Sequence, residues 1–326
     1  ADLTTVAGNA KHLEQLGYDG LRLAETNHDP FLPLTIAAEH TQHIELVTSV
    51  AVAFSRNPMS MAVLAHDLNA FAAGRLVLGL GSQVRPHIER RFSMPWHKAA
   101  AQMREFIEAM QAIFDCWYEG MRLEYMGQYY QHNLMPATFT PDNLDAPRPR
   151  IILSATGPLM TKVAAEVADG MIMHPFSSEK YMREVTLPAI ETGLANSGRQ
   201  LSQFALDYAP MIATGLSEET ITRAMGVLRD RIAFYGCTVA YKPVLDIHGW
   251  GDLQDELIQL NRQHRRADMA ALISDEMLTT IGIVGPPEEV IQTMKQRFSG
   301  LISRTGFTAP DIDDEQLREL LQQLRE

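Results

Sequence analysis

The sequence predicts an α/β protein of the (β/α)8 TIM-barrel class. Short apolar segments alternate with segments of helical periodicity along most of the chain, an order typical of a parallel sheet with right-handed crossovers. The apolar segment at residues 76–78 is unbroken rather than alternating, as expected for a parallel strand covered on both faces. A length of 326 residues suits one large α/β domain, so we expect a single domain over residues 1–326.

Local patterns define each element of the first third of the chain. Residues 4–16 have apolar positions at helical spacing, and Gly17 is placed to end that helix. The β-branched residues of 44–54 predict a strand, and Asn57-Pro58 predicts the start of the next helix. We therefore expect helices at residues 4–16, 33–40 and 58–73, and strands at residues 20–24, 44–54 and 75–79.

The remaining elements continue this order after an interruption. Alternation about Gly127 predicts a hairpin insertion at residues 121–130, followed by a proline-rich loop at 136–149. Residues 236–283 are helical and irregular, which predicts a second, helical insertion. We further expect strands at residues 150–158, 169–176, 204–214 and 301–307, and helices at residues 100–118, 159–168, 218–234, 250–262, 285–298 and 314–325.

The strand count falls short of a closed barrel. The patterns give about seven strands, whereas the closed barrel has eight. The printed chain opens on a helix with no strand before it, so we expect the first barrel strand to be the missing one.

Composition limits the classes of protein and partner. Hydrophobic residues make up 46% and charged residues 21%, the balance of a soluble globular protein. No apolar run reaches the ~18 residues of a membrane span, and no signal peptide is evident, so we expect a cytoplasmic protein without a membrane partner. The net charge of -12 argues against a nucleic-acid partner. Cys116 and Cys237 fit a reducing compartment and lack metal-site spacing.

In a barrel of this class the site forms at the carboxyl ends of the strands. No metal cage, Gly-x-Ser-x-Gly elbow or complete GxGxxG motif occurs there, so we expect no catalytic metal. The polar or glycine-containing groups expected at these ends are Glu25, Asn27 and His28; residues 49–54; residues 79–87; residues 154–158; His174; and residues 207–211.

Several of these groups have two interpretations on the sequence alone. Gly79 and Gly81 make room either for a bulky ligand or for close packing. Ser154-Ala155-Thr156-Gly157-Pro158 is either a phosphate seat at a helix start or an ordinary helix cap by Thr156. His28 and His174 are either proton donors or structural histidines. Arg56 and Arg85 are either contacts to a substrate or anionic tail, or solvated loop arginines.

Four motifs, in this order, resemble the bacterial luciferase-like monooxygenase family, and within it the branch that uses the deazaflavin coenzyme F420. They are Ala24-Glu-Thr-Asn-His-Asp-Pro-Phe-Leu-Pro-Leu34, Thr48-Ser-Val-Ala-Val-Ala-Phe-Ser-Arg-Asn-Pro58, Gly74-Arg-Leu-Val-Leu-Gly-Leu-Gly-Ser-Gln83 and Ala165-Glu-Val-Ala-Asp-Gly170. The resemblance implies a barrel that binds a flavin or deazaflavin at its carboxyl face, with the substrate against the ring.

The resemblance also assigns roles to residues. It implies that Asn27 and His28 touch the ring, that His28 exchanges a proton, and that a non-proline cis peptide lies within Ser49-Val50-Ala51. Some relatives carry an acid after the glycines of the strand at 75–79, where this chain has Gln83, Val84 and Arg85. The full set of expected cofactor-binding residues is Ser49, Val50, Ala51, Gly79, Gly81, Gln83, Ser154, Ala155, Thr156, Gly157, Pro158 and His174.

The expected activity is hydride transfer between a bound deazaflavin and a small organic substrate. Two alternatives stay open: a reduced-flavin monooxygenase that uses FMN, and a cofactor-binding protein without turnover. The resemblance implies a homo-oligomer, most simply a dimer.

Overall fold

Strands and helices alternate through most of the chain, as the sequence predicts. The structure, a computed structural model, describes residues 2–309 and 311–326, which divide into two units. The first unit takes in the residues up to Ala155 with Lys162–Ile172 and Gly193–Phe204, and the second takes in Thr156–Thr161, Met173–Thr192 and the residues from Ala205 on. Each unit is described separately below.

The first unit is built on a parallel sheet. Its register pairs Leu21 with Leu46, Leu46 with Leu76, and Leu78 with Ile151, so apolar side chains lie opposite one another across the sheet. The strand order is β1 (Gly20–Leu23), β2 (Glu45–Thr48), β4 (Leu76–Gly81), β7 (Arg150–Ala155) and β8 (Gly170–Met173), with β3 (Ala51–Val52) also paired to β4. The predicted parallel α/β class is confirmed.

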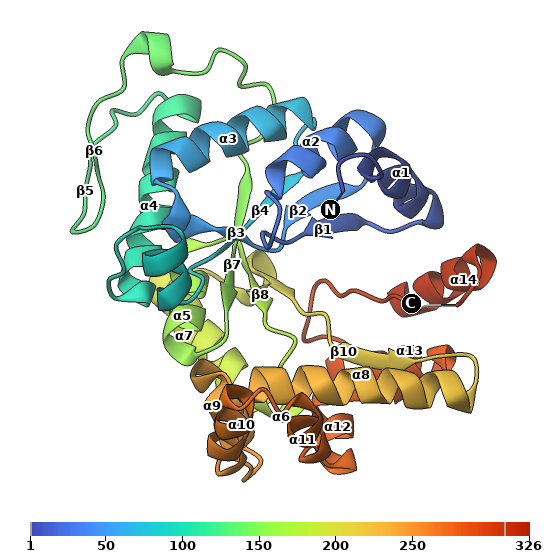
Figure 1. Cartoon of the computed structure of the whole chain (residues 1–326). Coiled ribbons are helices and arrows are strands. Elements are labelled where there is room, and N and C mark those ends of the chain that lie inside the picture. The colour runs from blue at the N-terminus through green and yellow to red at the C-terminus, as the bar shows by residue number, and fades with distance from the viewer. Residues whose placement is uncertain (1, 310) are drawn as a thin grey trace. The chain divides into compact units, whose positions relative to one another are not determined.

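The first helices of this unit begin and end at the predicted signals. Gly17, with a φ of 90°, ends the first helix, and Asn57 accepts a hydrogen bond from the Ser60 N–H at the start of the third. They are α1 (Val6–Leu16), α2 (Phe31–His40), α3 (Pro58–Phe71) and α4 (Ala99–Tyr118), and α5 (Pro158–Val167) and α7 (Leu187–Ser197) have residues in both units. Figure 1 shows α2 and α3 running side by side along the sheet.

A hairpin and a long loop follow α4. The hairpin strands are β5 (Tyr125–Met126) and β6 (Gln131–His132), which pair antiparallel. The Glu105 carboxylate of α4 accepts hydrogen bonds from the N–H groups of Gln128 (3.0 Å) and Tyr129 (2.6 Å), which ties the hairpin turn to the helix. The loop from the hairpin to β7 contains a 3-10 turn, Ala137–Phe139. This loop extends away from the sheet in Figure 1.

The second unit contains three short strands and most of the remaining helices. Its strands are β9 (Ala205–Asp207), β10 (Met211–Thr214) and β11 (Gly282–Gly285), of which β10 and β11 pair parallel. Its helices are α6 (Glu179–Tyr181), α8 (Glu218–Gly236), α9 (Lys242–Asp246), α10 (Leu253–Arg262), α11 (Arg266–Ala271), α12 (Asp275–Ile281), α13 (Pro287–Phe298) and α14 (Asp314–Arg325). Phe176, Leu228, Val244, Leu257 and Leu278 belong to its core, each at most 2% exposed.

Several predicted elements differ from the structure. The strand predicted at residues 44–54 is two strands, β2 and β3, followed by a 3-10 turn, Ala53–Ser55. The strand predicted at residues 204–214 is two strands, because Pro210 between them has no N–H to donate to a ladder. The strand predicted at 301–307 is wrong, since only a single bridge, between Asp207 and Arg304, forms there. A strand at Gly282–Gly285 lies where the sequence predicted helix, because four residues are too few for a clear period.

No described helix has both the length and the apolarity to cross a lipid bilayer. The described residues before α1 contain no strand.

Arg75 joins the amino end of β4 to the ends of two helices. Its guanidinium donates to the carbonyls of Ala72 and Ala38, at the ends of α3 and α2, at 2.9 and 3.0 Å. Three further bonds reach the Thr41 hydroxyl, the Ile44 carbonyl and the Thr41 carbonyl. One side chain therefore satisfies carbonyls that the helices leave without partners.

We predict that Arg75→Met lowers the free energy of unfolding by about 3 kcal/mol, because it leaves several half-buried carbonyls unpaired. Arg223→Met is the matched control, since exposed Arg223 pairs with Glu219 on its own helix, and it should change stability by less than about 0.5 kcal/mol. Urea denaturation of both variants measures the difference. Equal losses would contradict this role for Arg75.

Candidate functional site

The loop after β1 carries the two residues expected to act on the cofactor. Asn27 and His28 lie in the turn between Leu23 and the start of α2 at Phe31, and both are exposed. The Thr26 hydroxyl donates to the Asn27 side-chain oxygen at 3.0 Å. His28 is therefore open to a small molecule at the carboxyl end of β1.

The expected bulge lies directly beside this loop. β2 ends at Thr48, the peptide between Ser49 and Val50 is cis, and Ala51 begins the short β3. The Ser49 N–H donates to the Leu23 carbonyl at 2.8 Å, and the Glu25 N–H donates to the Val50 carbonyl at 3.2 Å. The cis peptide implied within Ser49-Val50-Ala51 is thus confirmed, and it joins the loop that carries His28.

Gly79 and Gly81 serve close packing within the sheet. A Cβ on Gly79 would lie 1.9 Å from the Thr48 carbonyl oxygen, and one on Gly81 would lie 2.6 Å from Val50 Cγ2. Both glycines belong to β4 rather than to the loop after it. Of the two interpretations from sequence, the packing one accounts for them: they make room for the bulge of the neighbouring strand.

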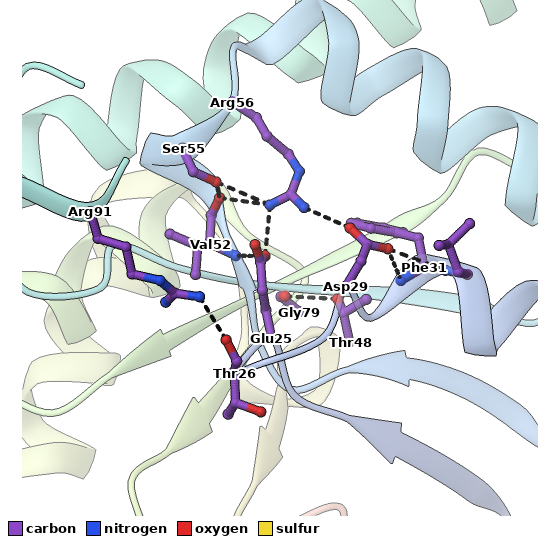
Figure 2. A network of polar contacts seen from close by, with 11 residues as sticks. Glu25, Thr26, Asp29, Phe31, Thr48, Val52, Ser55, Arg56, Gly79 and Arg91 are labelled. Carbon is purple, nitrogen blue, oxygen red and sulfur yellow. Dashed lines mark hydrogen bonds and ion pairs between the residues drawn. The ribbon is translucent and has the colours of Figure 1, made fainter. Parts of the chain in front are cut away.

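Two carboxylates bind the Arg56 guanidinium beside the bulge, as Figure 2 shows. Arg56 Nη1 lies 2.6 Å from Glu25 Oε2, and Nη2 lies 3.0 Å from Asp29 Oδ2. Glu25 Oε2 also accepts the Val52 N–H at 2.8 Å, and Asp29 Oδ1 accepts the Phe31 N–H at 2.8 Å. Glu25 and Asp29 flank Asn27 and His28, so the network fixes both ends of that loop.

The two arginines expected to contact an anion differ in their surroundings. Arg56 is held by Glu25 and Asp29, with its side chain 20% exposed. Arg85 is 66% exposed and pairs with Glu89 one turn later. The Gln83 side-chain oxygen accepts the Val84 N–H locally.

Sequence reasoning missed the role of Arg91. Its guanidinium donates to the Thr26 carbonyl at 2.7 Å, from the turn after β4 to the loop after β1 (Figure 2). The four-residue spacing of Glu25 and Asp29 around Asn27-His28 was a signal for the network, but the sequence does not indicate which arginine they bind.

The expected phosphate loop is divided between the two units. Ser154 and Ala155 end β7 in the first unit. In the second unit, Gly157 precedes α5, which begins at Pro158, and no atom lies within 4 Å of where a Cβ on Gly157 would stand. The Thr156 carbonyl accepts the Tyr181 hydroxyl at 3.1 Å, so this backbone group is bonded within the second unit.

Four buried hydroxyls of the second unit also lack partners within the described part of the chain. They are Thr161 Oγ1 on α5, Ser177 Oγ in the loop after β8, Thr214 Oγ1 on β10 and Thr305 Oγ1. A hydroxyl buried without a partner costs free energy unless a bound group uses it. Thr161 lies on α5, so its unpartnered hydroxyl belongs to the helix whose start would receive the phosphate of a flavin or deazaflavin.

His174 is enclosed by aromatic rings of the second unit. Its ring stacks on Tyr241, with centroids 4.4 Å apart, and meets Tyr235 edge-on at 4.6 Å. Its Nδ1 accepts the Phe176 N–H at 3.0 Å, so the neutral ring carries its proton on Nε2. Burial, and then the positive charge of Arg231, lower the pKa of His174 to about 4. This histidine is neutral near pH 7 and unsuited to donate a proton as an imidazolium.

The described residues contain no group of three His, Cys, Asp or Glu side chains that could hold a metal. The first-unit site presents His28, Asn27 and the backbone of the bulge, and ion pairs hold its loop.

The first unit thus combines a parallel α/β sheet with a histidine-bearing loop that is hydrogen-bonded to a strand bulge. The sequence profile described as luciferase-like monooxygenase matches residues 1–304. The chain therefore belongs to this family of enzymes.

Relatives with related sequences extend over nearly the whole chain. An uncharacterized protein of Mycobacterium tuberculosis strain H37Rv is 46% identical over 302 residues, which is 93% of this chain and 89% of the relative. The 5,10-methylenetetrahydromethanopterin reductase of Archaeoglobus fulgidus is 27% identical over 308 residues, which is 91% of this chain and 86% of the relative.

A solved structure shares the fold. The coenzyme F420 dependent tetrahydromethanopterin reductase of Methanopyrus kandleri superposes with a TM-score of 0.77 at 19% identity, covering 98% of this chain and 94% of that chain. The luciferase-like fold expected from the sequence is therefore present.

We predict a coupling energy of about 1–3 kcal/mol between Glu25 and Arg56 in a double-mutant cycle of Glu25→Gln and Arg56→Met, because both charged groups are largely withdrawn from water. The exposed pair Arg85 and Glu89, changed to Met and Gln, is the control and should couple by less than about 0.5 kcal/mol. Chemical denaturation measures both cycles. A coupling no larger than the control would show that the network does not hold the loop.

We predict that His174 makes the protein less stable in acid. Its folded pKa lies below the ordinary value near ~6.5, so the unfolded state binds the proton first and stability is lost as the pH falls from about 6.5 toward 4. Between pH 7 and 5 the wild type should lose about 2 kcal/mol more than His174→Gln. Denaturation at both pH values measures this difference, and parallel losses would contradict the buried, neutral state of His174.

Proposed function

We propose that the chain is an oxidoreductase that transfers a hydride between coenzyme F420 and a small organic substrate. Support comes from relatives whose names carry this coenzyme. One is a putative coenzyme F420-dependent oxidoreductase of Mycobacterium tuberculosis, 25% identical over 94% of this chain. Another is the F420-dependent glucose-6-phosphate dehydrogenase of Beutenbergia cavernae, 32% identical over 59% of this chain.

One observation carries the proposal: exposed His28 lies in a loop that is joined to the bulge at residues 49–51 by the bonds of Glu25 with Val50 and of Ser49 with Leu23. A planar ring that rests on the bulge would have His28 within reach of its edge. A deazaflavin, when bound, supplies the two-electron hydride chemistry and reacts only slowly with oxygen.

The residues of the chain would divide the remaining work. His28 would exchange the proton that accompanies hydride transfer, and Asn27 beside it would hydrogen-bond the ring or the substrate. Ser49, Val50 and Ala51 would support the ring from below. Residues 154–158, from Ser154 to Pro158, would hold the phosphate, with the N–H groups at the start of α5 as donors.

The principal alternative is a reduced-flavin monooxygenase that uses FMN. It is supported by a fold neighbour from Pseudomonas putida, described as a type II Baeyer-Villiger monooxygenase in complex with FMN, which superposes with a TM-score of 0.63 at 16% identity. A second alternative is a flavin- or deazaflavin-binding protein without turnover, which the lack of a carboxylate acid at Gln83 to Arg85 keeps open.

Further features of the proposal concern the whole chain. The family profile takes in residues of both units, which supports a single domain and an eight-stranded barrel. We also propose a homo-oligomeric cytoplasmic enzyme.

We predict that the protein purified with its native cofactor shows the absorption spectrum of a deazaflavin. The preference for F420 rests on the relatives, and the spectrum of the bound chromophore separates the two cofactors without knowledge of the substrate. A flavin spectrum would replace the proposal with the FMN alternative. Tight binding of either cofactor without turnover on any screened substrate would favour the binding protein.

We predict that His28→Ala lowers turnover by about a hundredfold or more and changes cofactor affinity far less, because proton transfer is lost while the bulge and phosphate seat remain. The control is His43→Ala, since His43 is also exposed but precedes β2 at the opposite, amino end of the strand. Steady-state kinetics and cofactor titration measure both effects. Unchanged turnover in His28→Ala would remove this residue from the mechanism.

A further inference from the structure

A cavity lies between three helices of the second unit. Among the residues discussed above, Arg231 and Tyr235, which lie near His174, line it. Its volume is about 330 Å³, and residues of α8, α10 and α11 line it. These helices lie close together in Figure 1. A volume of this size lies at the small end of the range for ligand pockets, which is ~300–1,000 Å³.

Two arginines face this cavity without an ion-pair partner in the described part of the chain. They are Arg231 on α8 and Arg266 at the start of α11, and both are exposed. Other arginines on the same elements are paired: Arg223 with Glu219, Arg229 with Asp275, and Arg265 with Asp268. The chain carries a net charge of -12, and these two arginines place two positive charges at one cavity.

The rest of the lining is largely apolar. Val227 and Phe234 are 58% and 49% exposed, and Met269 is buried beneath them at 3%. Guanidinium groups beside an apolar lining suit a molecule with a hydrocarbon body and an anionic head. Asp230 also lines the cavity but makes no ion pair with Arg231 or Arg266 among the described residues. Its negative charge would repel a bound anion, but it does not neutralise the two arginines.

Tyr235 connects this cavity to the end of β8 within the same unit. It lines the cavity and contacts the His174 ring at 4.6 Å. A molecule in the cavity would therefore contact Tyr235, whose ring packs on His174.

We propose that this cavity binds an amphipathic organic anion, with its phosphate or carboxylate head between Arg231 and Arg266 and its hydrocarbon body on Val227, Phe234 and Met269. The proposal does not depend on the cofactor or on the reaction proposed above.

The test uses n-octyl phosphate as the probe, measured by isothermal titration calorimetry on the full chain. The wild type should bind n-octyl phosphate at least tenfold more tightly than octan-1-ol, which lacks the charge, or inorganic phosphate, which lacks the hydrocarbon body. The double variant Arg231→Gln, Arg266→Gln should bind roughly tenfold or more weakly, because two charge-assisted hydrogen bonds are lost.

Two variants give controls of opposite kinds. Arg223→Gln removes a charge of the same helix outside the cavity and should bind as the wild type does. Asp230→Asn removes the opposing charge and should tighten binding, by roughly fivefold. The arginines and Asp230 are exposed, so all the variants should unfold at the wild-type temperature.

A second readout locates the probe without any variant. The methyl resonance of Met269 should shift on addition of n-octyl phosphate, since this side chain forms the floor of the cavity. Absence of binding, equal binding by octan-1-ol, equal binding by the double variant, or an unmoved Met269 resonance would each overturn the proposal. None of these outcomes bears on the cofactor spectrum or on His28.

Discussion

The ion pair between Glu25 and Arg56 is the interaction on which the site of the first unit depends. Both side chains are largely withdrawn from water, 9% and 20% exposed, and a charge in that position is costly unless it is paired and hydrogen-bonded. The Val52 N–H and Asp29 supply the further bonds that make the pair tolerable. The loop after β1 therefore cannot move away from the bulge without separating the Glu25 carboxylate from the Arg56 guanidinium.

Other contacts act on the same loop from different strands. Arg91 holds the Thr26 carbonyl, and Ser49 donates to Leu23 where β1 ends. Gly79 and Gly81 let the Thr48 carbonyl and Val50 approach β4, so the bulge occupies space that side chains would otherwise fill. Local sequence, strand packing and charge pairing thus favour one arrangement, in which Asn27 and His28 are exposed on a constrained turn.

Much of this arrangement could be predicted from the sequence. Gly17, Asn57-Pro58 and the apolar residues 76–78 predicted α1, α3 and β4, because caps and periodicity are local signals. The predicted strand ends also indicated that Asn27, His28 and Ser49 lie near one another, because strand ends follow from the same local signals. The role of Arg56 could not be predicted, because its partners Glu25 and Asp29 lie 31 and 27 residues away along the chain. The setting of His174 depends on Tyr235 and Tyr241, more than sixty residues later, so the sequence left its role open. The sequence did not predict β11, because the four residues before Pro286 and Pro287 are too few to show a periodic pattern.

Membership of the luciferase-like monooxygenase family leaves two cofactor chemistries, and we propose that either ring rests on the bulge beside His28. The most direct test is a crystal structure of the protein with oxidised coenzyme F420 bound. The account predicts ring density over the Ser49–Val50 peptide, with a nitrogen of His28 at hydrogen-bond distance from the ring or the substrate. Ring density elsewhere, with His28 turned to solvent, would contradict it.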